Sequence, residues 1–304
     1  MSKVVVVTGA NKGIGLATCR RLLREYGDVR VYLGSRDAGR GRGAVESLVA
    51  ENGAWEGRVS PLQLDVTDQA SVNAAVSEVG SPLFGLINNA GVGPTAGGSV
   101  AGTIAVNVEG TERVTRAFLP SIRDGGRVVH VTSASGSSGI ASLQGVAGGS
   151  PWPEILLSPG VTLEQVFEFC DAAKKAEGRP AGEAAALGFP PSEGSPMWQY
   201  NMSKAAENAL TLVHARENPR LSVNAVTPGF IDTDLTAPMR GGKPAADFGM
   251  KQPDDGAVPV VHVLMSDEVA AQQAGRYYGS DCKRSPMGFY RSPGDPEYDG
   301  SRGP

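Results

Sequence analysis

The chain alternates between short apolar runs and stretches in which apolar residues recur at helical spacing. Residues 4–7 are a β-branched apolar run of the kind found in strands that are buried on both faces. A helical pattern follows at residues 14–24. The same periodicities predict further strands at residues 30–33, 61–64, 83–88, 126–132, 221–226 and 275–279, and further helices at residues 44–51, 71–79, 101–119 and 200–215. Because strands that alternate with helices form parallel sheets, we expect a single-domain α/β protein with a doubly wound Rossmann fold over residues 1–291.

One segment interrupts this alternation. Glycine, serine and proline accumulate at residues 139–199, which we interpret as an insertion into the domain. Within it, Thr162 and Gln165 have the spacing of a capping box, and this predicts an amphipathic helix at residues 163–173. Residues 292–304 combine prolines, glycines and charges without an apolar period, so we expect a disordered tail there.

Composition narrows the class of protein. The chain has 304 residues, of which 40% are hydrophobic, and this suffices for one sizeable core. Its formal net charge of -4 provides no basic excess for a nucleic-acid backbone, so we expect no nucleic-acid partner. The apolar runs are far shorter than the roughly 20 residues of a membrane span, and the first strand leaves no room for a signal peptide before it. We therefore expect a cytosolic protein without a membrane partner.

The cysteines and histidines give no sign of a disulfide or a metal site. The three cysteines lie far apart without a CxxC pair, and the three histidines are isolated and lack the spacing of metal ligands. They are Cys19, Cys170 and Cys282, and His130, His214 and His262. We expect no bound metal, and core or surface positions for the histidines.

The loop after the first predicted strand carries the first candidate chemistry. Residues 8–15 read TGANKGIG and lie between a predicted strand and a predicted helix. Three glycines allow a tight turn, a close approach of the backbone to a pyrophosphate and close packing of the helix, whose amino end favours an anion. A glycine-rich turn taken alone is equally consistent with an ordinary loop. In this context we expect a dinucleotide site that includes Gly9, Asn11, Lys12, Gly13, Ile14 and Gly15.

The end of the second predicted strand indicates which dinucleotide is bound. A site for NAD would have an acidic residue there, whereas this chain has Ser35 and Arg36. A guanidinium pairs well with a 2′-phosphate, and Lys12 is placed to approach the same group from the glycine-rich loop. We therefore expect NADP(H) as the cofactor. The neighbouring Asp37 keeps NAD open as an alternative.

Two later loops are expected at the same edge of the sheet. Asp65 and Val66 follow the third predicted strand, where the carboxylate is placed to accept a hydrogen bond from an adenine amino group. Asn89, Ala90 and Gly91 follow the fourth, where small residues let the backbone approach a cofactor. Because the carboxyl ends of parallel strands meet at one edge, both loops should lie beside the glycine-rich loop.

Tyr200 and Lys204 are the strongest candidates for catalysis. They are four residues apart in a predicted helix, so they share one face, and the ammonium favours the ionised form of a phenol beside it. Such a phenol is suited to proton transfer. Taken alone, the pair is more typical of a surface tyrosine beside a solvated lysine. Ser133 ends the fifth predicted strand and is the candidate to join them, with Ser135 as an alternative.

Together these motifs resemble those of the short-chain dehydrogenase/reductase family, and in particular its carbonyl reductase branch, over residues 4–290. Further motifs that match are Asn107 within VNV and Pro228-Gly229 followed by Thr233. The resemblance implies that Pro228, Gly229 and Thr233 belong to a loop that covers the nicotinamide of NADP(H). It also implies a catalytic set that consists of Asn107, Ser133, Tyr200 and Lys204.

The resemblance assigns a role to each member of this set. Hydride passes from the reduced nicotinamide to a substrate carbonyl, Tyr200 donates the proton and Ser133 hydrogen-bonds the carbonyl oxygen. Tyr200 and Lys204 also bind the cofactor, Lys204 through the nicotinamide ribose, and Asn107 holds a water that leads to solvent. The expected function is NADPH-dependent reduction of an aldehyde, ketone or quinone to an alcohol. Oxidation of an alcohol by the same residues, and NADP binding without turnover in a regulatory protein, are the alternatives.

The insertion before the Tyr200 helix is similar to that of the carbonyl reductase branch, in which it implies a monomer. We expect the inserted helix to form a wall of the substrate pocket, with Phe167 or Phe169 in contact with the substrate. One motif departs from the branch, because residues 226–230 read VTPGF where carbonyl reductases often have CCPGW. The lining of the substrate pocket is therefore left open.

Overall fold

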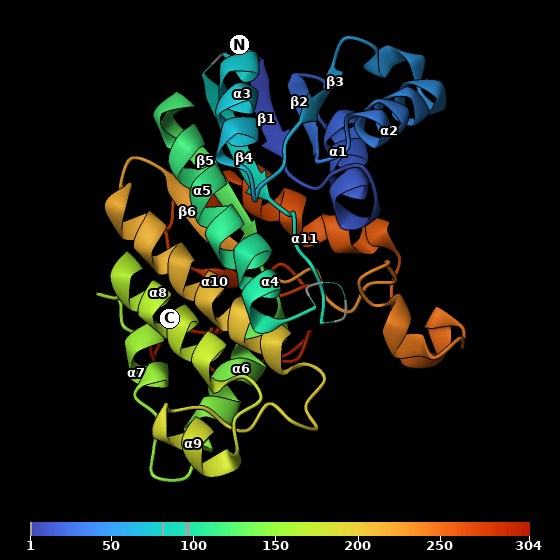
Figure 1. Cartoon of the computed structure of the whole chain (residues 1–304). Coiled ribbons are helices and arrows are strands. Elements are labelled where there is room, and N and C mark those ends of the chain that lie inside the picture. Colours follow the sequence, from blue (N-terminus) through green and yellow to red (C-terminus); the bar gives the residue numbers. More distant parts are fainter. Residues whose placement is uncertain (1, 81, 95, 97) are drawn as a thin grey trace.

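An eight-stranded sheet forms the centre of the protein in the computed structural model, which describes residues 2–80, 82–94, 96 and 98–304 (Figure 1). The strands are β1 (Lys3–Val7), β2 (Val29–Ser35), β3 (Val59–Gln63), β4 (Leu83–Asn88), β5 (Ile122–Val131), β6 (Ser222–Val226), β7 (Tyr277–Tyr278) and β8 (Arg284–Ser285). Their order in the sheet is β3-β2-β1-β4-β5-β6-β7-β8, and each of these pairs is parallel except β7 with β8. The chain winds outward from β1 in both directions, which confirms the predicted doubly wound Rossmann fold.

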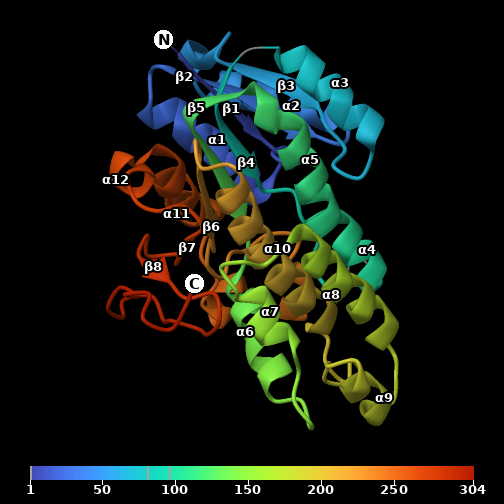
Figure 2. The same cartoon turned by 90° about the vertical axis from the view of Figure 1, so that its left-hand side faces the viewer.

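Helices cover both faces of this sheet (Figures 1 and 2). One face packs against α1 (Gly13–Glu25), α2 (Ala38–Glu51) and α11 (Pro253–Met265), and the other against α3 (Gln69–Val79), α5 (Thr111–Phe118) and α10 (Trp198–Glu217). Strand β1 shows how one run of valines supplies both cores. Val5 and Val7 pack in the core on the side of α1, α2 and α11, and Val6 packs in the core on the side of α3 and α5. Alternate side chains of a strand point to opposite faces of the sheet.

Several boundaries differ from the predicted ones. Helix α2 begins at Ala38, six residues early, because the Asp37 carboxylate caps it by accepting a hydrogen bond from the Arg40 amide at 2.8 Å. The single helix predicted at residues 101–119 consists of α4 (Val100–Ile104), a π-helical segment η2 (Ala105–Gly110) and α5. Strand β8 was not predicted, since two residues carry no period. The remaining short elements are η1 (Gly53–Trp55), η3 (Leu119–Ser121), η4 (Ala237–Arg240), η5 (Ala245–Phe248) and α12 (Asp267–Ala270).

The insertion forms a helical layer that extends beyond the sheet (Figure 2). Its elements are the end of α6 (Ala134–Gln144), α7 (Trp152–Leu156), α8 (Leu163–Ala176) and α9 (Ala181–Ala186). The capping box is confirmed, because Thr162 Oγ1 accepts from the Gln165 amide at 3.2 Å and Gln165 Oε1 accepts from the Thr162 amide at 3.0 Å. The rings of Trp152, Phe169 and Phe189 pack with centroids 5.3 to 6.0 Å apart. The insertion therefore has an aromatic core, which continues into α10.

The prediction of a disordered tail at residues 292–304 is corrected by the structure. The Tyr298 amide donates to the Arg284 carbonyl at 3.0 Å, and its ring meets Phe289 edge to face at a centroid distance of 5.5 Å. The Arg302 guanidinium lies 4.1 Å from the centroid of the Phe289 ring. The buried Tyr298 and backbone hydrogen bonds thus hold residues 292–304 in place. Neither feature gives a periodic pattern of apolar residues in the sequence.

Among the described residues, no helix has the length and the apolar character needed to cross a bilayer. No group of three or more histidine, cysteine or acidic side chains among the described residues is arranged to hold a metal ion.

The three cysteines are free thiols. Burial raises the pKa of Cys170 to about 12, so this thiol stays protonated at neutral pH.

Two of the histidines lie together in the core, although the sequence pattern gave them as isolated. His130 on β5 has Nδ1 3.1 Å from Asn88 Nδ2 and Nε2 3.0 Å from Nδ1 of His214 on α10. His214 Nε2 is 2.5 Å from Glu112 Oε2, and Glu112 Oε1 accepts from Arg116 Nε at 2.6 Å. The two histidines are 84 positions apart in the sequence, so no local pattern predicts the contact.

This network makes stability depend on pH. Burial holds the pKa of His130 well below its usual value, so the folded protein keeps the ring neutral while the unfolded chain takes up a proton below about pH 6.5. The free energy of unfolding should therefore fall by up to about 1.4 kcal/mol for each pH unit below that point. Burial raises the pKa of Glu112, but hydrogen bonds from His214 and Arg116 lower it more strongly. A second loss of stability should therefore follow below about pH 4.3.

Urea unfolding between about pH 5 and about pH 7.5 tests the contribution of His130. His130→Asn should flatten the dependence of the free energy of unfolding on pH, because the asparagine does not titrate. His262→Asn is the matched control, since His262 on α11 is only half-buried and takes no part in these contacts. Equal slopes for the wild type and His130→Asn would contradict the account.

Candidate active site

The glycine-rich loop connects β1 to α1. It lies at the carboxyl end of β1 beside β4, where the strand order of the sheet reverses. Gly9 and Gly13 have φ angles of +60° and +57°, which side chains rarely adopt. A Cβ atom at Gly9 would lie 2.8 Å from Ala90 Cα, so this loop passes directly against the loop that follows β4. Asn89 fixes the contact, because its Nδ2 donates to the carbonyls of Thr8 and Gly9 at 2.9 and 3.1 Å. The two predicted loops therefore meet at one edge of the sheet.

The amino end of α1 opens onto this turn. Lys12 is the N-cap residue of α1. In the part of the chain that the structure describes, its side chain accepts no hydrogen bond from the amides of the first turn. A Cβ atom at Gly15 would lie 2.7 Å from the Gly9 carbonyl oxygen and 2.8 Å from Ala10 Cα, so only glycine fits there. Asn11 and Ile14, on either side of the turn, are half-buried. Uncapped amides at the positive end of a helix suit an anion, so this cradle fits the pyrophosphate of a dinucleotide.

The residues predicted for the adenosine end differ in what they already contact. Arg36 is exposed directly after β2. Lys12 has its Nζ 2.6 Å from Asp234 Oδ2, in the loop after β6. Asp65 Oδ1 accepts from the amide and the hydroxyl two residues further on at 2.9 and 2.7 Å, and Val66 beside it is buried. Arg36 is thus the more accessible cation for a 2′-phosphate, whereas Lys12 is engaged in an ion pair.

The loop after β6 reaches back to the glycine-rich loop. A Cβ atom at Gly13 would lie 3.5 Å from Thr233 Cγ2. Pro228 is buried, and Gly229 has a φ angle of +92° and lines a cavity described below. The structure therefore brings the segment predicted to cover a nicotinamide against the segment predicted to hold the pyrophosphate.

Helix α10 presents Tyr200 and Lys204 on one face, as their spacing predicts. Both side chains are buried, and Lys204 Nζ lies 5.7 Å from the centroid of the Tyr200 ring. The ammonium donates to the Val131 carbonyl at 3.2 Å and lies 2.5 Å from Glu207 Oε2. Burial lowers the pKa of Lys204, but the charges of Glu207 and Tyr200 raise it more, so the ammonium is kept. Because β5 ends at Val131, the pair lies close to the start of the Ser133 turn.

Asn107 joins this group from the π-helical segment η2. Its Nδ2 donates to Ser203 Oγ at 3.0 Å, and Ser203 Oγ in turn donates to the Tyr200 carbonyl at 2.8 Å. A Cβ atom at Gly91 would lie 3.3 Å from Asn107 Oδ1 and 3.8 Å from Lys204 Nζ. One turn of π-helix inside a longer helix is frequent at functional sites. The predicted asparagine, tyrosine and lysine therefore lie together beside the loop after β4.

Ser133 lines a cavity of about 560 Å³ and is the one member of the predicted catalytic set in this lining, which combines aromatic side chains with small polar residues and the charged Lys251, Asp281 and Arg291. Its Oγ also caps α6 by accepting from the Ser135 amide at 3.1 Å, and Ser135 lines the same cavity. The aromatic side chains of the lining are Phe230, Tyr277, Phe289 and Tyr290. They come from the loop after β6, from β7 and from the C-terminal segment, and no sequence motif indicated them.

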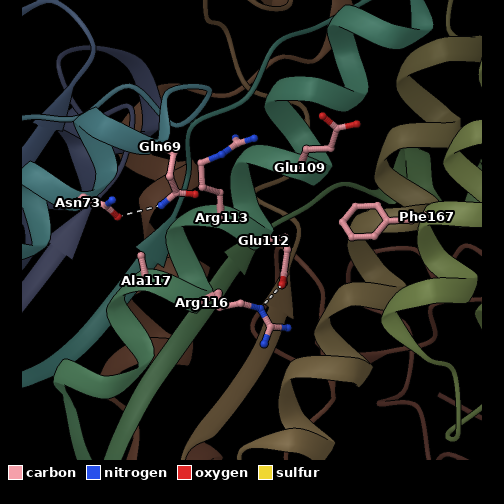
Figure 3. A pocket seen from close by; sticks show the side chains of 8 residues that line it. All are labelled: Gln69, Asn73, Glu109, Glu112, Arg113, Arg116, Ala117 and Phe167. Atoms are coloured by element: carbon pink, nitrogen blue, oxygen red, sulfur yellow. Dashed lines mark hydrogen bonds and ion pairs between the residues drawn. The ribbon is translucent and has the colours of Figure 1, made fainter.

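Helix α8, which the sequence predicts as a wall of the substrate pocket, contributes neither Phe167 nor Phe169 to the lining of the Ser133 cavity. Phe169 is fully buried in the aromatic core of the insertion. Phe167 faces another cavity of about 540 Å³, which lies between α3, α5 and α8 (Figure 3). In that cavity Glu112 is paired with Arg116, and Figure 3 shows none of the predicted catalytic residues on its walls. The insertion packs against α10 rather than over the Ser133 cavity.

Glu207 lies beside the predicted catalytic lysine, although no sequence motif indicated it. Its side chain is 1% exposed and is in contact with the Lys204 ammonium. Burial raises the pKa of Glu207 to about 7, although Lys204 lowers it. Lys204 and Glu207 are three residues apart on a helix, and this spacing is compatible with an ion pair. The spacing alone does not reveal that both charges are buried.

Comparisons with known proteins indicate the family to which the chain belongs. Residues 3–145 match the family model for short chain dehydrogenase. The chain is 31% identical to (+)-neomenthol dehydrogenase from Arabidopsis thaliana, over 77% of this chain and 84% of that protein. It is also 31% identical to carbonyl reductase (NADPH) 1 from Homo sapiens, over 90% of this chain and 95% of that protein. Menthone neomenthol reductase from Mentha piperita has a similar structure, with a TM-score of 0.72 at 25% identity, covering 92% of this chain and 99% of that one.

The likenesses to these proteins extend over most of the chain, and the family model includes the glycine-rich loop. The chain belongs to the short-chain dehydrogenase family and is an enzyme of the oxidoreductase class.

Proposed function

We propose that the enzyme reduces an aldehyde, a ketone or a quinone to an alcohol with NADPH as the reductant. One observation carries the proposal: Tyr200, Lys204 and Asn107 are grouped in the interior at the edge of the sheet that holds the glycine-rich loop. From this edge Ser133 lines the cavity of about 560 Å³. A phenol beside an ammonium supports proton transfer, and a cavity with four aromatic side chains among its lining residues suits an organic carbonyl.

The residues present fit NADP(H), and the name of the human carbonyl reductase supports the same cofactor for this chain. The glycine-rich loop and the amino end of α1 would hold the pyrophosphate, and Arg36 the 2′-phosphate. Asp65 would accept from the adenine, Lys204 would bind the nicotinamide ribose, and Thr233 would contact the carboxamide. When bound, the reduced nicotinamide supplies a hydride for the carbonyl carbon.

The protein's own residues meet the charge that develops on the carbonyl oxygen. Tyr200 donates its phenolic proton to this oxygen, and the Ser133 hydroxyl donates a hydrogen bond to it. Lys204 stabilises the phenolate that Tyr200 becomes. Asn107 holds the water through which a proton returns from solvent. Each of these groups is held in place by the packing of α10, η2 or the end of β5, which keeps them preorganised.

Arg36→Asp is expected to reverse the preference for NADPH over NADH. The substitution removes a charge-assisted contact with the 2′-phosphate and introduces repulsion, which together change the ratio of kcat/KM values by about 10- to 100-fold. Steady-state kinetics with both cofactors measure this ratio. Arg179→Asp is the matched control, because Arg179 is an exposed arginine of the insertion and the substitution changes the net charge equally. An unchanged ratio in Arg36→Asp would remove this residue from the site.

A panel of aldehydes, ketones and quinones tests the function as a whole. We expect oxidation of NADPH, followed by its absorbance, together with formation of the alcohol. Binding of NADPH without turnover of any carbonyl would contradict the proposal and favour a regulatory protein. Turnover of alcohols with NADP but of no carbonyl would favour the oxidative direction instead.

A monomeric state is also proposed. Helix α8 of the insertion packs against α4 and α10, and it therefore covers a helical face that would otherwise be open to a second copy of the chain. A cytosolic location stays a prediction.

A further inference from the structure

Glu207 is a buried carboxylate to which the function proposed above assigns no role. It lies on α10 one turn after Lys204, and its side chain is 1% exposed. Its Oε2 lies 2.5 Å from Lys204 Nζ, whose side chain is 5% exposed. Charges removed from water attract each other strongly, but each is costly without its partner. The carboxylate and the ammonium therefore depend on each other for their charged states.

The Lys204 ammonium has a second acceptor besides Glu207, and the two acceptors together fix its position. Lys204 Nζ also donates to the Val131 carbonyl at 3.2 Å, at the end of β5. The carboxylate on α10 and the carbonyl on β5 thus hold the ammonium between helix and sheet, 5.7 Å from the centroid of the Tyr200 ring. A lysine side chain is long and flexible, so two fixed acceptors greatly restrict where its charge can lie.

Few other charged or titratable groups face this carboxylate. On its own helix it faces Lys204 and, beyond that, Tyr200. Strand β5 contributes His130, which stays neutral because burial and the charges of His214 and Lys204 lower its pKa. On helix α5, the acidic side chain of Glu112 is engaged with His214 and not with Lys204. Among the described contacts of Lys204, the carboxylate of residue 207 is the only acidic partner.

We propose that Glu207 is a positioning residue that holds the Lys204 ammonium beside Tyr200, keeps it charged and so sets the upper pH limit of carbonyl reduction. This inference rests on the proposed function, because it assumes that Lys204 and Tyr200 take part in the reaction.

Glu207→Gln should lower that pH limit. Without the carboxylate, burial makes the Lys204 ammonium lose its proton at a lower pH. The earlier loss of the ammonium should lower the limit by on the order of one pH unit. Burial raises the pKa of Glu207 to about 7, so the two pH profiles should have the same shape below that pH and diverge above it.

The experiment is the pH profile of kcat for NADPH oxidation, with the fastest carbonyl of the panel as the probe. We expect the upper limit of the Glu207→Gln variant to lie about one pH unit below that of the wild type. Glu207→Asp keeps the charge on a shorter side chain, so its limit should lie between the two. Glu112→Gln is the control, because Glu112 is also buried and ion-paired, and its profile should follow that of the wild type.

Two results would overturn the role of Glu207. One is a Glu207→Gln profile that differs from the wild type by the same factor at every pH, as expected of a residue that only supports the fold. The other is an equal shift in Glu112→Gln. If the glutamine variant does not fold, Glu207→Asp decides, and a limit identical to that of the wild type would overturn the proposal.

Failure of the proposed function would look different. A wild-type enzyme that turns over no carbonyl defeats the proposed function, whatever the variants do. A wild-type enzyme that reduces carbonyls, with a pH limit unaffected by Glu207→Gln, defeats only the role of Glu207.

Discussion

Tyr200→Phe is expected to lower kcat for carbonyl reduction by about 10²- to 10⁴-fold and to leave NADPH binding nearly unchanged. The substitution removes the hydroxyl that donates the proton but keeps the ring, which packs near Lys204 on the buried face of α10. Turnover is measured by NADPH absorbance, and binding by titration calorimetry.

The matched control is Tyr278→Phe. Tyr278 on β7 is also buried, and its hydroxyl lies 3.4 Å from Gln272 Oε1, away from the Ser133 cavity. This variant should reduce carbonyls at nearly the wild-type rate. Wild-type kcat in Tyr200→Phe would show that another group donates the proton.

Lys204→Met is expected to abolish measurable turnover and to lower the free energy of unfolding by about 3–5 kcal/mol at about pH 8. Without the ammonium, the Glu207 carboxylate is left buried with no opposite charge. Burial raises the pKa of Glu207 to about 7 even beside the lysine, so in the variant the carboxyl binds a proton that the unfolded chain releases. The loss of stability should therefore shrink as the pH falls toward about 5.

The double variant Lys204→Met/Glu207→Leu separates the two consequences. It replaces the ion pair by apolar side chains of similar size, so it should recover most of the stability of the wild type without recovering turnover. Urea unfolding of the two variants measures the first effect and NADPH oxidation the second. A double variant as unstable as Lys204→Met would contradict the account of the buried pair.

The fold and the edge that carries the site could be predicted because they depend on local patterns. The valines of β1 indicate a strand buried on both faces, and the glycines after it need positive φ angles that other residues avoid. Tyr200 and Lys204 share a helical face by spacing alone. Each of these signals extends over a few neighbouring residues, which is why a single sequence carries them.

What the sequence did not predict depends on contacts between distant segments or on single residues. His130 and His214 pair across 84 positions, and the tail is placed by Tyr298 with a few backbone hydrogen bonds. Phe167 and Phe169 have similar chemistry, and only packing shows that one is in the core of the insertion and the other faces a cavity away from the site. These outcomes follow from tertiary packing, which periodicity does not encode.

Transfer of deuterium from NADPH labelled at the nicotinamide C4 position is the most direct test of the proposed reaction. The wild-type enzyme is incubated with the labelled cofactor and a carbonyl of the panel, and the alcohol is analysed by mass spectrometry. We predict an alcohol that carries the deuterium on its carbinol carbon, and almost none of this product with Tyr200→Phe. Alcohol without deuterium, or no alcohol from a wild-type enzyme that binds NADPH, would contradict hydride transfer to a carbonyl as the function of this protein.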